Sequence, residues 1–364
     1  MKQAQEKIRI NMLSQAHRVK GQGVLSAYEE QVGLVKNGLS DRFEVTENRV
    51  SLPDITHIHT VNPSYFLSIP FLELRGTTVG YVHFLPETLE NSLNLPKLFR
   101  QVFYKYLIGF YKSLDHLVVV NPYFIDRLEE YGVPREKITY IPNFVSDEDF
   151  YPYTPEYKRL ARQRWGLDPD RFTVMCAGQL QTRKGVMDFA EIARRMPQVQ
   201  FIWAGGFSFG QMTDGYRQIK ELLDNPPKNL VFPGMIEREQ MNEIYNLGDV
   251  MFLPSYEELF PMTVLEAMSA NIPILLRDIP IYEKILMDFY LKGKDQEEFI
   301  AILQRLESDP SYRQQACDAS RRGHAFYSRG HVLELWKEFY TSILQEKPSF
   351  RARINRKLPF GKEF

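Results

Sequence analysis

Short apolar segments alternate with longer amphipathic segments along almost the whole chain, and this alternation limits the possible folds more than any other feature. In the first half we predict strands near KIRINML, THIHTV, TTVGYVHF, DHLVVVN and KITYIPN. The second half repeats the pattern with RFTVMCAG, VQFIWAGG, NLVFPGM, VMFLPS and IPILLR, and is helical from residue 294 to about residue 346. Strands that alternate with helices favour parallel sheets in an α/β fold.

The length of the chain and one proline-bearing passage predict two domains. A chain of 364 residues is too long for one ordinary core. The passage YPYTPEYKRLARQRWGLDPD separates the two halves. We therefore expect two doubly wound domains, 1–150 and 151–330, and a C-terminal helix and basic tail, 331–364, that returns toward the first. Ligands of open α/β sheets bind beyond the carboxyl ends of the strands, so we expect a site in the cleft between two facing domains.

Charge and composition exclude several classes of protein. The 45 Lys and Arg residues nearly balance 46 Asp and Glu residues, so no global field attracts nucleic acid. No apolar run reaches the roughly 18 residues that cross a bilayer, and the start MKQAQEKIRINML lacks the core of a signal peptide, so we expect a cytoplasmic protein. Two cysteines are too few for a disulfide framework or a zinc site, and Cys176 in FTVMCAG is expected in a core.

The segment EELFPMTVLEAM, residues 257–268, carries the strongest candidate site. It follows a predicted strand, and Pro261 suits the start of a helix over about 262–270. The N–H groups of Met262 and Thr263 at this helix start would face a pyrophosphate. Glu258 and Glu266 would accept hydrogen bonds from sugar hydroxyls. Taken alone, acids near a helix start can equally complement its dipole, and that alternative stays open.

Three further candidates follow other predicted strands. In CAGQLQTRKGVMDF, we expect Arg183 and Lys184 to neutralise a diphosphate, although a Lys before a Gly is often a solvated loop residue. In VKGQGVL, Gly21 and Gly23 allow close approach of the backbone to a ligand, and the missing third glycine argues against a dinucleotide fingerprint. His83 in VGYVHFLPE lies at a strand end, as a site residue or as a structural histidine.

The passage NLPKLFRQVFYKYLIGFYKSLDH predicts a helix with one packed face and one basic face. At ~100° per residue, the packed face holds Leu95, Phe99, Val102, Phe103, Tyr106 and Phe110. The opposite face has no acid and consists of Lys97, Arg100, Tyr104, Lys105, Ile108, Tyr111 and Lys112. Tyrosines among cations suit an anionic membrane surface, and the tail KPSFRARINRKLPFGKEF offers a second basic contact. A solvated face with a frayed tail is the alternative.

The chain resembles the retaining glycosyltransferases of the GT-B fold with an E-x7-E motif. Five segments carry the resemblance: the G-x-G pair, VVVNPYFIDRLEEYGVPREKITYIPNFV, GQLQTRKG, WAGG and EELFPMTVLEAM. The resemblance covers about residues 8–330 and implies two facing Rossmann-like domains. It implies that Glu258 contacts the donor sugar and that Glu266 holds the nucleotide ribose. Lys184 would bind the diphosphate, and His83 would lie near the reacting centre.

The chain departs from the family pattern at two positions. Gln179 stands where the family often has Arg, and Pro261, after Phe260, stands where Gly is common. Pro261 has no N–H, so the amide contacts fall to Met262 and Thr263. Gly206 in WAGG is a further copy of a family position. The family implies transfer with retention, in which fixed cations neutralise the leaving group and no metal or other cofactor is required.

The resemblance is closest to bacterial enzymes that build diglycosyldiacylglycerols. It implies that a UDP-sugar donates a hexose to a monoglycosyldiacylglycerol, by a protein peripheral to the inner face of the cell membrane. Transfer to a capsule, cell-wall or other saccharide is a second possibility. A sugar-nucleotide-binding membrane regulator without turnover is a third, and an NAD-linked oxidoreductase is a distant fourth. Glucose and galactose donors both stay open.

Overall fold

The computed structural model describes residues 7–15, 23–51, 53–86, 97–207, 210–258 and 260–346, without the side chains of 23–27, 97–100 and 212. The chain divides into two compact units. The first comprises the chain up to Asn143 together with the chain from Gly330 onward, and the second runs from Phe144 to Arg329. The division falls slightly before residue 150, and the C-terminal helix belongs to the first unit.

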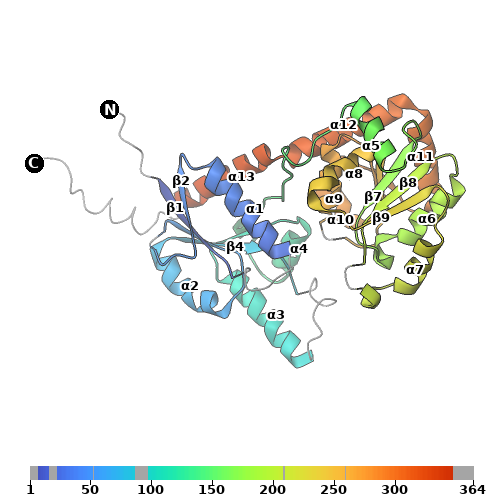
Figure 1. Cartoon of the computed structure of the whole chain (residues 1–364). Coiled ribbons are helices and arrows are strands. Elements are labelled where there is room, and N and C mark those ends of the chain that lie inside the picture. The colour runs from blue at the N-terminus through green and yellow to red at the C-terminus, as the bar shows by residue number, and fades with distance from the viewer. Residues whose placement is uncertain are drawn as a thin grey trace, which may run out of the picture. The chain divides into compact units, whose positions relative to one another are not determined.

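The first unit contains a parallel six-stranded sheet in the order β2-β1-β3-β4-β5-β6 (Figure 1). Its strands are β1 (Ile8–Leu13), β2 (Phe43–Glu47), β3 (Ile55–Ile58), β4 (Thr77–Val82), β5 (His116–Val119) and β6 (Ile138–Tyr140). Its helices are α1 (Gly23–Gly38), α2 (Pro63–Arg75), α3 (Lys97–Lys112), α4 (Tyr123–Glu130), the short η3 (Arg135–Lys137) and α13 (Arg329–Glu346). The five strands predicted in this half are confirmed, and β2 was not predicted.

The strand order assigns the helices of the first unit to the two faces of its sheet. α2, α3 and α4 connect β3 to β6 in one direction, so right-handed crossovers place them side by side on one face. α1 connects β1 to β2 in the opposite direction and therefore covers the other face. α13 packs beside α1, where Gln31 Nε2 donates to Tyr340 Oη at 3.3 Å (Figure 1).

The second unit contains another parallel six-stranded sheet, in the order β12-β11-β10-β7-β8-β9. Its strands are β7 (Thr173–Ala177), β8 (Gln200–Ala204), β9 (Leu230–Gly234), β10 (Val250–Leu253), β11 (Ile274–Arg277) and β12 (Leu291–Gly293). Its helices are α5 (Pro155–Arg164), η4 (Thr182–Lys184), α6 (Val186–Arg195), η5 (Gly210–Met212), α7 (Tyr216–Asp224), η6 (Arg238–Gln240), α8 (Met241–Leu247), α9 (Met262–Ser269), α10 (Pro280–Leu286), α11 (Gln296–Ser308) and α12 (Pro310–Phe326). The predicted strands and the C-terminal helical region are confirmed, and β12 was not predicted.

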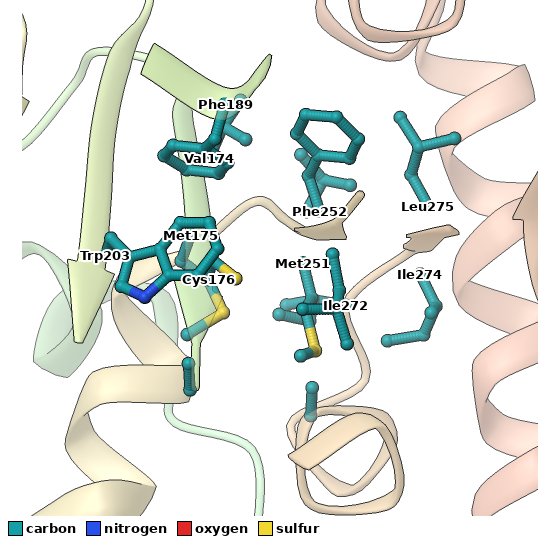
Figure 2. Close-up of a cluster of buried hydrophobic side chains, with 14 of the residues drawn as sticks. Val174, Met175, Cys176, Phe189, Trp203, Met251, Phe252, Ile272, Ile274 and Leu275 are labelled. Carbon is teal, nitrogen blue, oxygen red and sulfur yellow. The ribbon is translucent and has the colours of Figure 1, made fainter. Parts of the chain in front are cut away.

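The inner strands β7 and β10 of the second sheet are apolar, as is typical of strands that helices cover on both faces. β7 and β10 are buried at every position. Their side chains pack with Phe189 of α6 and Trp203 of β8 (Figure 2). The prediction that Cys176 is a core residue is confirmed, because it is fully buried in this cluster.

The passage expected to separate the domains forms α5 and is fastened to the second sheet. The hydroxyl of Thr154 accepts a hydrogen bond from Tyr157 N–H and caps the helix. The buried Arg162 donates to Asp249 at 2.7 Å, and Lys158 donates to the same carboxylate at 2.8 Å. Burial by itself would raise the pKa of Asp249, but the two cations outweigh burial and hold that pKa below its ordinary value.

Candidate active site

Two loops lie side by side at the carboxyl edge of the second sheet. One follows β7 and the other follows β10. The N–H of Tyr256 donates to the carbonyl of Arg183 at 2.8 Å, and the Arg183 guanidinium donates to the carbonyl of Glu257 at 3.3 Å. Gly185 has φ +75°, and a Cβ there would overlap the carbonyl of Pro254, so the Lys-Gly pair permits this close approach.

The loops bring Lys184 and Glu258 together, although the sequence separates them by 74 residues. Their side chains form an ion pair and are only 13% and 6% exposed. The Ser255 hydroxyl donates to the same Glu258 oxygen at 2.8 Å. Nearly buried charges persist when they are paired and hydrogen-bonded, so this carboxylate is held in place by two partners. Sequence reasoning did not identify Ser255, whose only signal is its place at the end of a predicted strand.

Glu266 has its own set of partners inside the second unit. The carboxylate accepts a hydrogen bond from Tyr245 Oη at 2.6 Å and one from Arg238 at 3.1 Å. Burial and the adjacent carboxylate raise the pKa of Tyr245 well above its ordinary value, so its hydroxyl stays a donor. Sequence reasoning missed both partners, because Tyr245 lies in an apolar helix and has the pattern of a core residue.

Helix α9 begins where the sequence predicts, at Met262 after Pro261. Pro261 is the N-cap, and its carbonyl accepts a hydrogen bond from Val264 N–H at 3.0 Å. The N–H groups of Met262 and Thr263 belong to the first turn, where an α-helix offers no internal acceptor. Before the helix, Phe260 packs edge-on against the ring of Tyr327, 6.1 Å away.

The remaining donor-site candidates of the second unit follow β7 and β8. Gln179 is exposed on the β7 loop. The carbonyl of Gly206 accepts a hydrogen bond from Leu180 N–H at 3.0 Å, which ties the two loops together. Gly205 has φ +148°, and a Cβ there would overlap the carbonyl of Gly178, so this crossing requires a glycine.

A buried arginine fastens the loop that carries Glu258. The Arg277 guanidinium lies 3.9 Å from the ring centre of Tyr256 and donates to Asp188 at 2.5 Å. The Tyr256 hydroxyl donates to the same Asp188 oxygen at 2.6 Å, and Arg277 Nε donates to the Pro254 carbonyl at 3.0 Å. Sequence reasoning did not identify this network, because its members come from α6, β11 and the β10 loop.

His83 follows β4 in the first unit and lies in a group of aromatic rings. Its ring centre is 4.5 Å from that of Tyr81 and 6.3 Å from that of His59. Burial lowers the pKa of His83 to about 3, and burial together with His83 lowers that of His57 to about 3. Nε2 of His83 has no hydrogen-bond partner among the described residues. Gly23 begins α1, and Gly21 lies outside the described residues.

Helix α3 differs from its predicted faces at two positions. Tyr111 was expected on the basic face, but it is 1% exposed and donates its hydroxyl to the Phe84 carbonyl at 2.9 Å. Val102 was expected in the packed face, but it is 61% exposed. The prediction is wrong at both positions. Tyr111 is buried because α3 packs against the chain after β4 as well as against the sheet, and nothing in the structure explains the exposure of Val102. Lys105 and Lys112 are exposed, and Tyr104 is half-buried.

A surface pocket of about 370 Å³ lies along α3 and is lined by Pro86, Tyr104, Lys105, Ile108, Gly109, Lys112 and Tyr131. The side chains of Lys97 and Arg100, and the basic tail, lie outside the described residues. Within the described part of the chain, no helix has the length and apolarity of a membrane span. The same residues hold no group of three or more His, Cys, Asp or Glu side chains arranged for a metal ion.

The fold and the loops define a class of protein. The family model for glycosyl transferases group 1 matches residues 158–323, and the model for glycosyltransferase family 4 matches residues 42–149. Sucrose-phosphate synthase from Thermosynechococcus elongatus has a TM-score of 0.71 at 17% identity, covering 94% of this chain and 100% of that chain. Anabaena HepE in complex with UDP-glucose has a TM-score of 0.68 at 15% identity, covering 92% and 100%. The predicted GT-B fold is confirmed.

Relatives of known function narrow the class. The alpha-galactosylglucosyldiacylglycerol synthase of Streptococcus pneumoniae is 46% identical over 335 residues, which cover 92% of this chain and 90% of that protein. The processive diacylglycerol alpha-glucosyltransferase of Acholeplasma laidlawii is 28% identical, over 78% of this chain and 87% of that protein. The chain therefore belongs to the family of the pneumococcal synthase, and it is a hexosyltransferase, as the sequence predicts.

Proposed function

We propose that this protein transfers a hexose from a UDP-sugar to a monoglycosyldiacylglycerol, with retention of configuration at the anomeric carbon. The observation that carries the proposal is the Lys184–Glu258 ion pair beside the start of α9. The pair brings a cation and a carboxylate together at the edge of the sheet where α/β proteins bind ligands, which supports a site for a diphosphate beside a sugar. The names of the two relatives support the lipid acceptor.

Four side chains at this edge have roles in the proposed donor site. Lys184, Arg183 and the first-turn amides of α9 hold the diphosphate and its growing charge as the sugar leaves. Glu258 accepts hydrogen bonds from the hexose hydroxyls. Glu266, oriented by Tyr245, accepts hydrogen bonds from the ribose hydroxyls.

The proposed reaction exchanges one bond for another at the anomeric carbon. The bond from that carbon to the diphosphate oxygen breaks, and a bond to the acceptor hydroxyl oxygen forms. The acceptor proton passes to the leaving diphosphate, so no protein base is needed. His83 is a neutral imidazole at neutral pH, because burial lowers its pKa to about 3.

The acceptor side of the proposal rests on the first unit. Exposed Lys105 and Lys112, with Tyr104, form the described part of a basic face on α3 that would contact anionic lipid head groups. Lys97 and Arg100 complete that face in the sequence. We propose that the protein is peripheral on the inner face of the cell membrane, where a glycolipid acceptor is accessible.

Product analysis tests the proposed reaction. The purified chain is incubated with UDP-glucose or UDP-galactose and with monoglucosyldiacylglycerol, and the lipids are analysed by mass spectrometry. We expect one added hexose and release of UDP with one of the two donors, and an α-linkage by NMR of the product. A parallel reaction with an oligosaccharide acceptor tests the alternative acceptor class. Binding of UDP without any product would instead favour a regulator without turnover.

A further inference from the structure

Helix α2 carries large apolar side chains on both of its faces, and the polar Ser64 and Arg75 are exposed near its two ends. Its inner face packs on the core through the buried Ile69 and through Tyr65 and Leu72. Its outer face carries Leu67, Phe71 and Leu74, which are 73%, 67% and 70% exposed. The spacings of four and three residues place these side chains on one side of the helix, and the exposed Pro70 lies among them. We call Leu67, Pro70, Phe71 and Leu74 the outer stripe.

An apolar outer stripe is unusual for a helix on the surface of a soluble unit. A helix that is apolar all round normally lies inside a protein or in contact with lipid. Single exposed apolar residues need no explanation, but a contiguous exposed row marks an interaction surface. Leu67, Phe71 and Leu74 are all largely exposed in the described part of the chain, so the outer stripe is a candidate interaction surface.

The neighbour of α2 indicates which partner fits. The Phe66 ring lies 5.5 Å from that of Tyr106 and 5.9 Å from that of Phe110, and Tyr106 Oη donates to the Val61 carbonyl at 2.6 Å. α2 and α3 thus pack together on one face of the sheet (Figure 1), so their outer sides belong to one surface. α3 contains no acid, and its Lys105 is exposed beside Val102.

We propose that the outer stripe of α2 inserts into the interfacial layer of an anionic lipid bilayer, beside head groups that contact Lys105 and Lys112 of α3. The proposal rests on the proposed function, in which a diacylglycerol-linked acceptor is reached at the bilayer surface. It adds an apolar contact, on a helix that sequence reasoning did not single out, to the basic face of α3.

Length indicates how α2 would lie on a bilayer, and charge favours a bilayer over a second copy of this chain. The 13 residues of α2 are too few to span a bilayer, which takes about 20, so the helix lies along the surface. Interfacial helices bury an apolar side and keep cations at the polar boundary. A symmetric dimer through the same surface would bring two acid-free, lysine-bearing α3 helices together, and like charges oppose that contact.

Vesicle flotation tests the proposal with the full chain and vesicles of equimolar phosphatidylcholine and phosphatidylglycerol. The variant Leu67→Ser, Phe71→Ser, Leu74→Ser should bind at least about tenfold more weakly, because three large apolar side chains no longer leave water. The matched variant Val50→Ser, also at an exposed apolar site, should float like the wild type. Lys105→Gln with Lys112→Gln should instead reduce the salt-sensitive part of binding. Undiminished flotation of the triple variant would overturn the proposal.

A labelling experiment covers the case in which the triple variant folds poorly. Phe71→Cys in a Cys317→Ser background carries an environment-sensitive fluorophore, since the remaining Cys176 is buried. Its emission should shift to the blue on addition of vesicles, and a label at Leu160→Cys on α5 should not shift. Absence of the shift at position 71 would contradict insertion. A second result would also contradict insertion: the wild type is a dimer in lipid-free solution and the triple variant is a monomer. The stripe would then bind a second copy of the chain.

Transfer in detergent separates this proposal from the proposed function. With the acceptor dispersed in neutral micelles, the triple variant should transfer hexose as fast as the wild type, because the stripe lies outside the donor site. If the wild type forms no product in micelles, the proposed function fails while the flotation result still stands. If the wild type forms product but the triple variant floats with vesicles as well as the wild type does, only the inference about α2 fails.

Discussion

The ion pair of Lys184 and Glu258 gives the candidate donor site its charge balance. Each side chain is almost buried, and each would be costly to leave without a partner. In the proposed donor site, a bound diphosphate would offer Lys184 a second anion and would release Glu258 to accept hydrogen bonds from a sugar. The hydrogen bond from the Ser255 hydroxyl would keep the carboxylate in position during that exchange.

Glu258→Gln should lower kcat at least about a hundredfold, because the amide accepts weaker hydrogen bonds than the carboxylate and cannot stabilise positive charge on the sugar. UDP should bind this variant at least as tightly as the wild type, since Lys184 no longer has a competing anion. Steady-state transfer and titration calorimetry with UDP measure the two quantities. The exposed neighbour provides the control, Glu257→Gln, which should behave as the wild type. Loss of UDP binding along with activity would refute the assigned role of Glu258.

The loop after β10 is held by contacts from two other elements of the second unit. Arg277 on β11 and Asp188 on α6 fix both the ring of Tyr256 and the carbonyl of Pro254, immediately before Glu258. Neither residue has an assigned contact with substrate, so both act by positioning.

Arg277→Lys keeps a positive charge beside Asp188 but loses the planar group that stacks on Tyr256. We expect kcat to fall about tenfold, since small errors in position are costly for transfer, while KM for the acceptor stays unchanged. Steady-state kinetics with the donor and the acceptor varied separately measures this division. Lys292→Gln changes an exposed lysine and serves as the control. An equal fall in kcat in that variant would show that the effect is not specific to the loop.

At the opposite end of the second sheet, α5 depends on the carboxylate of Asp249, which is only 20% exposed. Asp249→Asn should lower the free energy of unfolding by about 3–5 kcal/mol, because Arg162 and Lys158 lose their counter-charge. Asp170→Asn removes an exposed partner of Arg159 and should cost less than about 1 kcal/mol. Urea unfolding followed by fluorescence compares the two variants. Equal costs would mean that the Asp249 cluster is no more important than a surface pair.

On the scale of the whole molecule, the buried histidines make stability depend on pH. The pKa of His57 is about 3 in the folded chain, below the ordinary value of about 6.5, and burial lowers that of His59 as well. At a pH between the folded and the unfolded pKa of His57, the unfolded chain binds more protons than the folded chain. The free energy of unfolding therefore falls as the pH falls below about 6.5. The slope is at most about 1.4 kcal/mol per pH unit for each histidine.

His59→Phe should make that slope shallower and raise stability at pH 5. Neither ring nitrogen of His59 has a hydrogen-bond partner among the described residues, so the change removes a titrating group without breaking a known bond. Urea unfolding at pH 7, 6 and 5 measures the slope for both chains. A steeper slope in the variant would contradict the assigned origin of the pH dependence.

Particular elements show how far the sequence predicts the fold. The ten predicted strands include the inner strands of both sheets, because strands buried on two faces are continuous apolar runs. The two missed strands, β2 and β12, are both edge strands, whose exposed positions break that pattern. α9 and its N-cap follow from Pro261 and the preceding strand, since both signals are local.

The sequence by itself determined the two α/β units, the family, the loops in which Lys184 and Glu258 lie, and the helix that carries Glu266, because strand runs, turns and helix starts are encoded by neighbouring residues. Only the tertiary structure decided which residues hold those side chains, namely Ser255, Tyr245 and Arg238. It also decided that Tyr111 is buried and that the outer stripe of α2 is not. The physical reason is that helical periodicity determines which residues share a face, whereas burial of that face depends on elements distant in the chain.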